Sequence, residues 1–98
     1  MIRVIIKRQV REGCFQDYLE MIRRARKRAS LVEGFIAGEL LQQQGQGNSA
    51  FLISSWETID AWNKWQASTE RAEVLQQMRP LLTKNEEVTV LESCQLMR

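Results

Sequence analysis

The chain has 98 residues, of which 44% are hydrophobic, and this size predicts one small domain over residues 1–98 with a thin core. Its 14 basic and 12 acidic residues give a net charge of +2, too near neutrality to indicate a nucleic-acid or membrane partner. The absence of histidine excludes Ser-His-Asp and Cys-His nucleophiles and removes the commonest metal and haem ligand. No metal or cofactor is therefore expected, and any catalysis falls to carboxylates, Lys, Arg, Tyr, Cys or the substrate.

The sequence has no apolar run of about 18 residues and no signal-peptide pattern at its start, so a soluble, cytoplasmic protein is expected. Cys14 and Cys94 are its two cysteines and lack the C-x-x-C spacing of metal and redox sites. Both fit small hydrophobic positions in a reducing compartment, while a disulfide between them stays open.

Residues 2–10 alternate in hydrophobicity and predict a first strand, with Ile2, Val4 and Ile6 facing the core. Residues 12–31 change to a helical period. Their apolar stripe consists of Phe15, Tyr18, Leu19, Ile22, Ala25, Ala29 and Val32. Acidic residues precede a basic cluster at 23–28, as the helix dipole favours. The cluster is interpreted as a solvated helix face rather than a nucleic-acid patch, because no aromatic residues interleave with it.

Glu33-Gly34 ends this helix, since glycine suits the left-handed cap position. Residues 35–44 predict a second strand and residues 45–48 a turn, after which a third strand runs over 51–56. Thr58 is expected to cap a short helix to Gln66.

Ser68 is expected to cap a further helix to about residue 79, and Pro80 to kink or end it. The apolar positions of that helix are Ala72, Leu75, Met78 and Leu82. Residues 87–92 alternate again and predict a fourth strand.

The element order β-α-β-β-α-β predicts an α+β, ferredoxin-like fold, with the helices on one face of an antiparallel sheet. The alternation places Ile5, Leu52 and Leu91 on one face of the sheet. The opposite face is assigned Val4, Ile6, Phe51, Ile53, Val88 and Val90. Because both faces then carry apolar side chains, a second copy of the chain is the expected cover, and a homodimer is predicted.

Three features of the sequence occur together: a helix ending in Glu33-Gly34-Phe35, a strand ending in Trp56, and a short helix leading into W-x-x-S-x-x-R at Trp65, Ser68 and Arg71. In this combination the sequence resembles the antibiotic biosynthesis monooxygenase superfamily of dimeric α+β barrels. The resemblance extends from Ile2 to about Glu92. It implies a homodimer whose two sheets close into a barrel, with a pocket between sheet and helices in each subunit. Members include cofactor-independent oxygenases of polycyclic phenols, quinol oxidases and haem-degrading enzymes.

For the haem-degrading members, the resemblance implies a pattern of an Asn on the first strand, a Trp on the short helix and a His ten residues after that Trp. In this sequence Ile6 stands at the Asn position, Trp65 at the Trp position and Leu75 at the His position. Without an axial imidazole, haem degradation is not expected.

The cofactor-independent oxygenases suggest an Asn and a Trp around an electron-rich phenol that reacts with O₂ after deprotonation. On this resemblance Trp65 and Trp62 are candidates to stack on a substrate ring, and Tyr18, Asn63 and Arg71 are candidate polar contacts. Each has a structural alternative. The tryptophans and Tyr18 suit the core, Asn63 suits a solvent-facing helix position, and Arg71 suits a surface ion pair.

Among the tryptophans, Trp65 is expected to face the pocket, whereas Trp56 and Trp62 are expected to be fixed packing. Two functions stay open, and no catalytic residue is identified. One is a monooxygenase of a small aromatic or quinol-type substrate that works without a cofactor. The other is a non-catalytic homodimeric barrel that binds a small apolar ligand. The missing Asn and His favour this second function.

Overall fold

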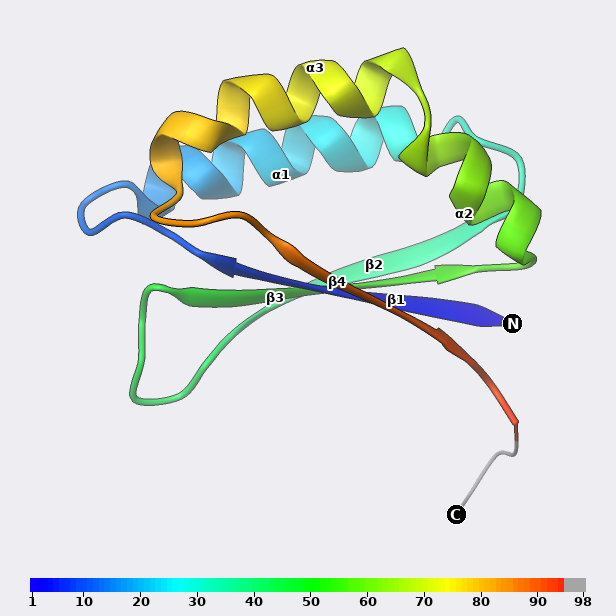
Figure 1. The fold of residues 1–98 in the computed structure, drawn as a ribbon, viewed down its shortest axis with the longest axis horizontal. Coiled ribbons are helices and arrows are strands. Elements are labelled where there is room, and N and C mark those ends of the chain that lie inside the picture. The colour runs from blue at the N-terminus through cyan, green and yellow to red at the C-terminus, as the bar shows by residue number, and fades with distance from the viewer. Residues whose placement is uncertain (95–98) are drawn as a thin grey trace.

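The computed structural model describes residues 1–94, which form an antiparallel sheet in the order β2-β3-β1-β4 with the helices on one face (Figure 1). The strands are β1 (Ile2–Gln9), β2 (Phe35–Gln42), β3 (Ser49–Trp56) and β4 (Glu87–Glu92). The helices are α1 (Phe15–Ala29), α2 (Ile59–Gln66) and α3 (Thr69–Met78), and the 3₁₀ turn η1 (Arg79–Leu81) follows α3. The predicted α+β, ferredoxin-like fold is therefore confirmed.

The local signals in the sequence account for most element boundaries. The Thr58 side chain accepts a hydrogen bond from the Ala61 amide, and Ser68 does the same for Arg71, so both predicted caps are present. The helix α3 ends before Pro80, as predicted. The helix α1 begins later than expected, because Gly13 forms a turn with φ of +84° ahead of it. The strand β3 begins at Ser49 rather than at residue 51, because its pairing with β1 continues to Gln9.

The register of the sheet corrects the predicted faces. Residues directly opposite in antiparallel strands point to the same side, and Leu52 lies opposite Ile6. Leu52 therefore faces the helices, and its predicted place beside Ile5 is wrong. Ile53 lies opposite Ile5, so it faces away from the helices, as does Phe51 two residues before it.

The face of the sheet without helices, called here the open face, thus carries the apolar residues Ile5, Phe51, Ile53 and Leu91. Val88 and Val90 share the helix side, opposite Ile6 and Val4, as predicted. They remain 41% and 43% exposed because β4 is an edge strand whose residues are all exposed in this chain.

The space between sheet and helices holds two groups of buried apolar residues, and Leu52 packs against both. The first group contains Ile2, Val4, Ile6, Ala29, Trp56, Ala61, Trp62 and Trp65. The second contains Val10, Tyr18, Ile22, Ala50 and Met78. Edge-to-face aromatic contacts fix the packing of the first group. The ring centroid of Trp56 lies 5.1 Å from that of Phe35 and 5.7 Å from that of Trp62, and both pairs are T-shaped. Cys14 is half-buried beside the second group, and neither Cys14 nor the exposed Cys94 forms a disulfide.

A buried ionic network centres on Glu86, in the segment before β4. Its carboxylate accepts hydrogen bonds from Arg8 of β1 at 2.8 Å and from Arg71 of α3 at 2.7 Å. Arg8 also donates to the hydroxyl of Tyr18 at 3.3 Å, and the guanidinium of Arg71 lies 5.6 Å from the ring centre of Trp62. One carboxylate therefore joins β1, α3 and the approach to β4.

This network also corrects the expectation for α3. Arg71 was expected at the surface, but it is 8% exposed, because its partner Glu86 is itself mostly enclosed. Ala72, predicted as an apolar contact, is exposed instead. Met78 is fully buried as predicted, and Leu75 is half-buried. The buried residue in the first turn of α3 is thus the charged Arg71, and a search for periodic apolar residues cannot identify it.

The network sets the protonation of its members. Burial alone would raise the pKa of Glu86, but the charge of Arg8 and the hydrogen bond and charge of Arg71 outweigh burial and lower it. Burial raises the pKa of Tyr18 above its usual 10.0, despite the opposing charge and hydrogen bond of Arg8. Glu86 is therefore ionised at neutral pH, and Tyr18 is neutral.

We predict that Glu86→Gln lowers the free energy of unfolding at pH 7 by about 3 kcal/mol, because two buried guanidinium groups lose their counter-charge. Since folding lowers the pKa of Glu86, its contribution is complete above the ordinary carboxyl value of 4.5 and is lost as the pH falls through the lowered pKa. Urea unfolding at several pH values should show a weaker acid dependence in the variant. Glu73→Gln is the control, since Glu73 pairs with Arg28 at the surface and should change stability by less than about 1 kcal/mol. Equal losses in both variants would contradict the prediction.

The turn between α1 and β2 positions the start of α2. Gly34 has φ of +94°, the left-handed conformation expected of it, but it does not cap the helix as predicted, because α1 already ends at Ala29 with Ser30 as its C-cap. The Gly34 carbonyl accepts a hydrogen bond of 2.7 Å from the Glu57 amide. A Cβ atom on Gly34 would lie 2.7 Å from the Cβ of Ala61. The turn and α2 are therefore in close contact.

Gly34→Ala is predicted to lower the free energy of unfolding by at least about 2 kcal/mol, because left-handed strain and the clash with Ala61 add together. Gly45→Ala separates the two effects, since Gly45 has φ of +80° but no atom near an added Cβ, so about 1 kcal/mol is expected. Chemical denaturation measures both. A loss for Gly34→Ala no greater than that for Gly45→Ala would show that the close contact is unimportant.

Candidate functional site

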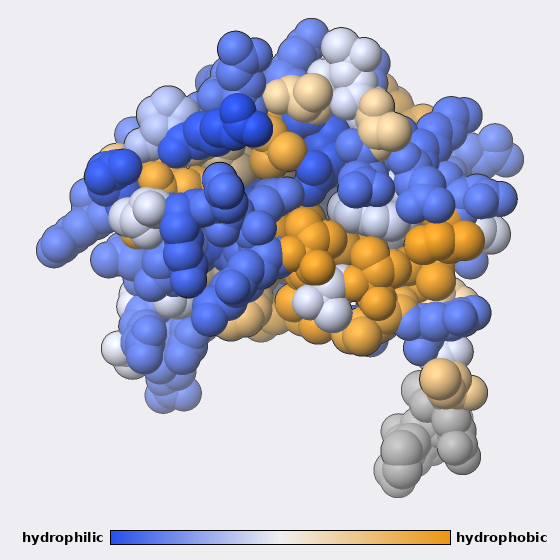
Figure 2. Space-filling model, in the orientation of Figure 1, coloured by the Kyte–Doolittle hydropathy of each residue, from blue (hydrophilic) through white to orange (hydrophobic). Residues whose placement is uncertain are grey.

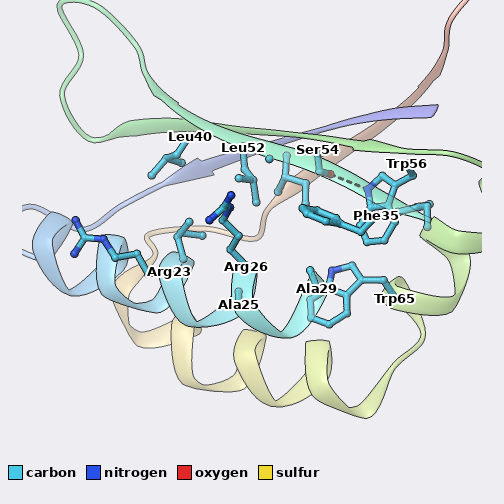
Figure 3. Close-up of a pocket in the computed structure, with 14 residues that line it drawn as sticks. Arg23, Ala25, Arg26, Ala29, Phe35, Leu40, Leu52, Ser54, Trp56 and Trp65 are labelled. Carbon is cyan, nitrogen blue, oxygen red and sulfur yellow. Dashed lines mark hydrogen bonds between the residues drawn. The ribbon is translucent and has the colours of Figure 1, made fainter. Parts of the chain in front are cut away.

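A cavity of about 160 Å³ lies between the sheet and the helix layer (Figure 3). Its lining comes from α1, α2 and the strands β1, β2 and β3. The lining residues are Ile6, Ile22, Arg23, Ala25, Arg26, Ala29, Phe35, Gly38, Leu40, Leu52, Ser54, Trp56, Trp62 and Trp65. On the face of the molecule seen in Figure 2, apolar surface gathers below the polar helix layer.

The cavity is apolar apart from three side chains. Ser54 is buried, and its hydroxyl accepts a hydrogen bond of 3.0 Å from the indole nitrogen of Trp56. A hydroxyl also has a proton to donate, which can serve a ligand oxygen. Arg23 and Arg26 are exposed residues of α1 that line the mouth of the cavity. The site therefore offers apolar walls, one inner hydroxyl and two outer cations.

Small residues leave the space that the aromatic rings enclose. Gly38 of β2 lies opposite Ser54 of β3, and an added Cβ on Gly38 would have the ring of Phe35 at 3.8 Å as its nearest neighbour. Ala25 and Ala29 face the same space from α1 (Figure 3). A larger side chain at Gly38 would fill the cavity without a backbone clash, because the nearest backbone atom, the Ile53 carbonyl oxygen, lies 3.9 Å from an added Cβ, and without strain, because the φ of Gly38 is not in the left-handed region.

The structure brings together two of the five predicted ligand-contact residues. Trp62 and Trp65 line the cavity and are 2% and 7% exposed. Asn63 lies between them on α2 but is exposed and is not part of the lining. Tyr18 and Arg71 belong to the Glu86 network, so Arg71 is related to the cavity only through the ring of Trp62. Ligand binding by these residues remains a prediction.

Sequence reasoning missed Ser54, Phe35, Gly38 and Arg26 as site residues. The misplaced face of Leu52 hid Ser54, because residues two apart on a strand share a face. Arg26 was counted with the solvated cluster, although it lies four residues after Ile22 and three before Ala29, both in the lining. That spacing was the available signal. Trp56 also lines the cavity, although it was expected only to pack.

The positions compared with the haem-degrading pattern are divided in space. Ile6 and Trp65 line the cavity, whereas Leu75 lies on α3 beside a different hollow, formed with residues 79–86. Within residues 1–94, no group of His, Cys, Asp and Glu side chains is arranged to hold a metal ion. Over the same residues, no helix is long and apolar enough to cross a membrane.

Solved structures share this fold. The structure of SnoaB, a cofactor-independent oxygenase from Streptomyces nogalater, is similar with a TM-score of 0.87 and 20% identity, over 98% of this chain and 95% of that one. A conserved protein from Methanosarcina mazei Go1 has a TM-score of 0.87 and 18% identity, over 95% of this chain and 92% of that one. Identities this low show a common fold and leave the activity to be argued from the site.

Sequence comparison identifies the family. A curated relative, the 42.8 kDa protein in the whiE locus of Streptomyces coelicolor, is 28% identical over 82 residues, which are 84% of this chain. The match spans only 20% of that protein, so this chain corresponds to about a fifth of its length. The family model described as antibiotic biosynthesis monooxygenase matches residues 1–77, which contain every residue that lines the cavity. The chain therefore belongs to the antibiotic biosynthesis monooxygenase family.

Proposed function

We propose that the protein is a monooxygenase that works without a cofactor on a small aromatic phenol or quinol held in the cavity. The observation that carries this proposal is the wall of aromatic rings, Phe35, Trp56, Trp62 and Trp65, around one buried hydroxyl. Flat faces and edges of this kind suit an aromatic ring, and the few polar groups can orient it. A cavity of about 150 Å³ can enclose a benzene molecule, so 160 Å³ fits one ring, and a larger substrate has to extend through the mouth.

The proposed chemistry needs little from the protein beyond this environment. An ionised phenol can give an electron to O₂, after which oxygen is transferred to the ring system. When a ring CH₂ becomes a carbonyl, one O₂ is consumed and one water is released, so no other reductant is required. Apolar walls exclude water from the reactive species, and the Ser54 hydroxyl can donate to the substrate oxygen.

A second function is favoured by a specific feature of the lining. Among its fourteen residues there is no carboxylate, Lys, Tyr or Cys that could accept the phenolic proton. In an oxygenase this proton would leave through the mouth to solvent. If it does not leave, the cavity only binds an aromatic compound, and the protein is a non-catalytic ligand carrier.

We predict that the protein consumes O₂ with a subset of hydroquinones and polycyclic phenols, and that Gly38→Val abolishes consumption by filling the cavity. Trp65→Phe should reduce consumption and change the affinity for flat phenols, at about 0.5–3 kcal/mol of stability. An oxygen electrode measures the rate, and a peroxide assay distinguishes oxygen transfer from oxidation of a quinol to a quinone with release of H₂O₂.

Asn63→Ala is the matched control for Trp65→Phe, since Asn63 is on the same helix but exposed. It should leave the rate unchanged. Binding of phenols without O₂ consumption would favour the carrier. If no aromatic compound binds the parent protein and Trp65→Phe unfolds it, Trp65 is only a core residue and both functions are wrong.

The proposed enzyme is a homodimer that buries the open face. Ile5, Phe51, Ile53 and Leu91 are adjacent there through the pairing of β3, β1 and β4, and no helix of residues 1–94 covers this side of the sheet (Figure 1). Family membership supports this proposal, and a sheet covered by helices on one face alone needs a second cover for an apolar opposite face.

We predict a mass of two chains at micromolar concentration by light scattering after gel filtration, because interfaces of this kind are extensive. Ile53→Asp should shift the mass towards one chain, since it places an unpaired charge on the open face. Asn63→Asp makes the same charge change on an exposed helix position and should leave the mass unchanged. A single-chain mass for the parent protein would exclude the dimeric barrel.

A further inference from the structure

We propose that the cavity selects aromatic anions, with Arg26 binding a negatively charged oxygen of the ligand at the mouth. The shared chemistry is a flat ring bearing a carboxylate or an ionised phenol. This inference rests on the proposed function of the same cavity, and names its substrate class. Figure 3 shows the Arg26 side chain rising from α1 towards the sheet, whereas Arg23 extends along the helix.

The position of Arg26 on α1 is unusual for an arginine that has no ion-pair partner within residues 1–94. Ile22 and Ala29 are buried, and Arg26 is one turn from each on the same side of the helix. The attraction of cations to a helix C-terminus explains why the last turns are basic. That attraction does not explain why a cation lies at the border of the apolar stripe, where an aliphatic side chain would pack well.

Charge compensation separates the two arginines of the lining, Arg26 and Arg23, from the arginines that form ion pairs within the fold. Arg8 and Arg71 share the carboxylate of Glu86, and on α1 Arg28 pairs with Glu73 at 3.1 Å. Arg26 and Arg23 form no ion pair with any carboxylate of residues 1–94. The lining contains no acidic residue either, so the mouth has an unbalanced positive charge beside an apolar interior.

The surroundings strengthen binding of an anion at this place. A guanidinium makes charge-assisted hydrogen bonds to carboxylate and phenolate oxygens, and these are stronger next to low-dielectric walls than in water. An ionised ligand should therefore bind about ten- to hundredfold more tightly than a neutral compound of the same shape. The same cation lowers the pKa of a bound phenol, because it stabilises the phenolate left after the proton goes to solvent.

The test is a calorimetric titration of the full chain with three naphthalene compounds that differ at one substituent. They are 2-naphthoate, 2-naphthol and the neutral alcohol 2-naphthalenemethanol. At pH 7 we expect naphthoate to bind at least about tenfold more tightly than the alcohol. Naphthol should gain affinity as the pH approaches its ionisation, which distinguishes the phenolate source of the charge from the carboxylate source.

Arg26→Gln should remove most of the preference for naphthoate and leave the affinity for the alcohol nearly unchanged, and Arg26→Lys should retain part of it. Arg24→Gln is the matched control, because Arg24 is exposed on the same helix, is not in the lining, and the variant loses the same net charge. Since Arg26 is exposed, the variant should fold, which its thermal unfolding checks.

The inference is overturned if the alcohol binds as tightly as naphthoate, if Arg24→Gln weakens naphthoate as much as Arg26→Gln does, or if none of the three compounds binds. Loss of O₂ consumption has a different meaning. A preference for naphthoate that depends on Arg26, in a protein that consumes no O₂ with any phenol, supports the inference and contradicts the oxygenase.

Discussion

The ion pairs of Glu86 are the interaction on which the arrangement of the molecule depends. This carboxylate lies where β1, α3 and the segment before β4 meet, and it compensates the charges of Arg8 and Arg71, residues that are 4% and 8% exposed. Such a site is stable only while all members are present, since a buried arginine without a counter-charge is strongly unfavourable. Arg71 extends the effect to the cavity, because its guanidinium packs against the ring of Trp62, which forms part of the wall. The polar network and the apolar site therefore share one boundary.

The cavity is notable because a chain of 98 residues has little core to spare. An empty apolar space of 160 Å³ would correspond to at most about 4 kcal/mol of lost packing, with the open mouth reducing this amount. The surrounding rings limit the loss. Trp56 contacts Phe35 and Trp62 edge to face, and its indole nitrogen donates to Ser54, so the wall is held without any ligand. Such a wall is preorganised for a flat molecule, whose entry would recover the missing contacts.

Features that depend on neighbouring residues were predicted from the sequence, whereas features that depend on contacts between distant parts of the chain were not. The Thr58 and Ser68 caps act within a few residues and were predicted from residue type, as was the left-handed conformation of Gly34, although α1 ends at Ala29 and not at Gly34. The register of β3 against β1 depends on residues about fifty positions apart, and the wrong face for Leu52 concealed Ser54. Burial of Arg71 depends on Glu86, fifteen residues later, in a segment without a pattern of its own. Trp62 and Trp65 were predicted because their helical spacing is local, whereas Arg26 was missed because its neighbours across the cavity lie on other elements.

The arginines of this chain show how charge compensation distinguishes structural from ligand-directed roles. Arg8 and Arg71 are more buried than Arg26, yet each has its full counter-charge within the fold, so their burial indicates stability and not binding. Arg26 is exposed, lies beside apolar walls and has no carboxylate partner within residues 1–94, so its charge is free to pair with an external anion. Burial alone would therefore rank these residues in the wrong order. The counter-charge each one has in the folded chain is the better guide to where an anionic ligand would bind.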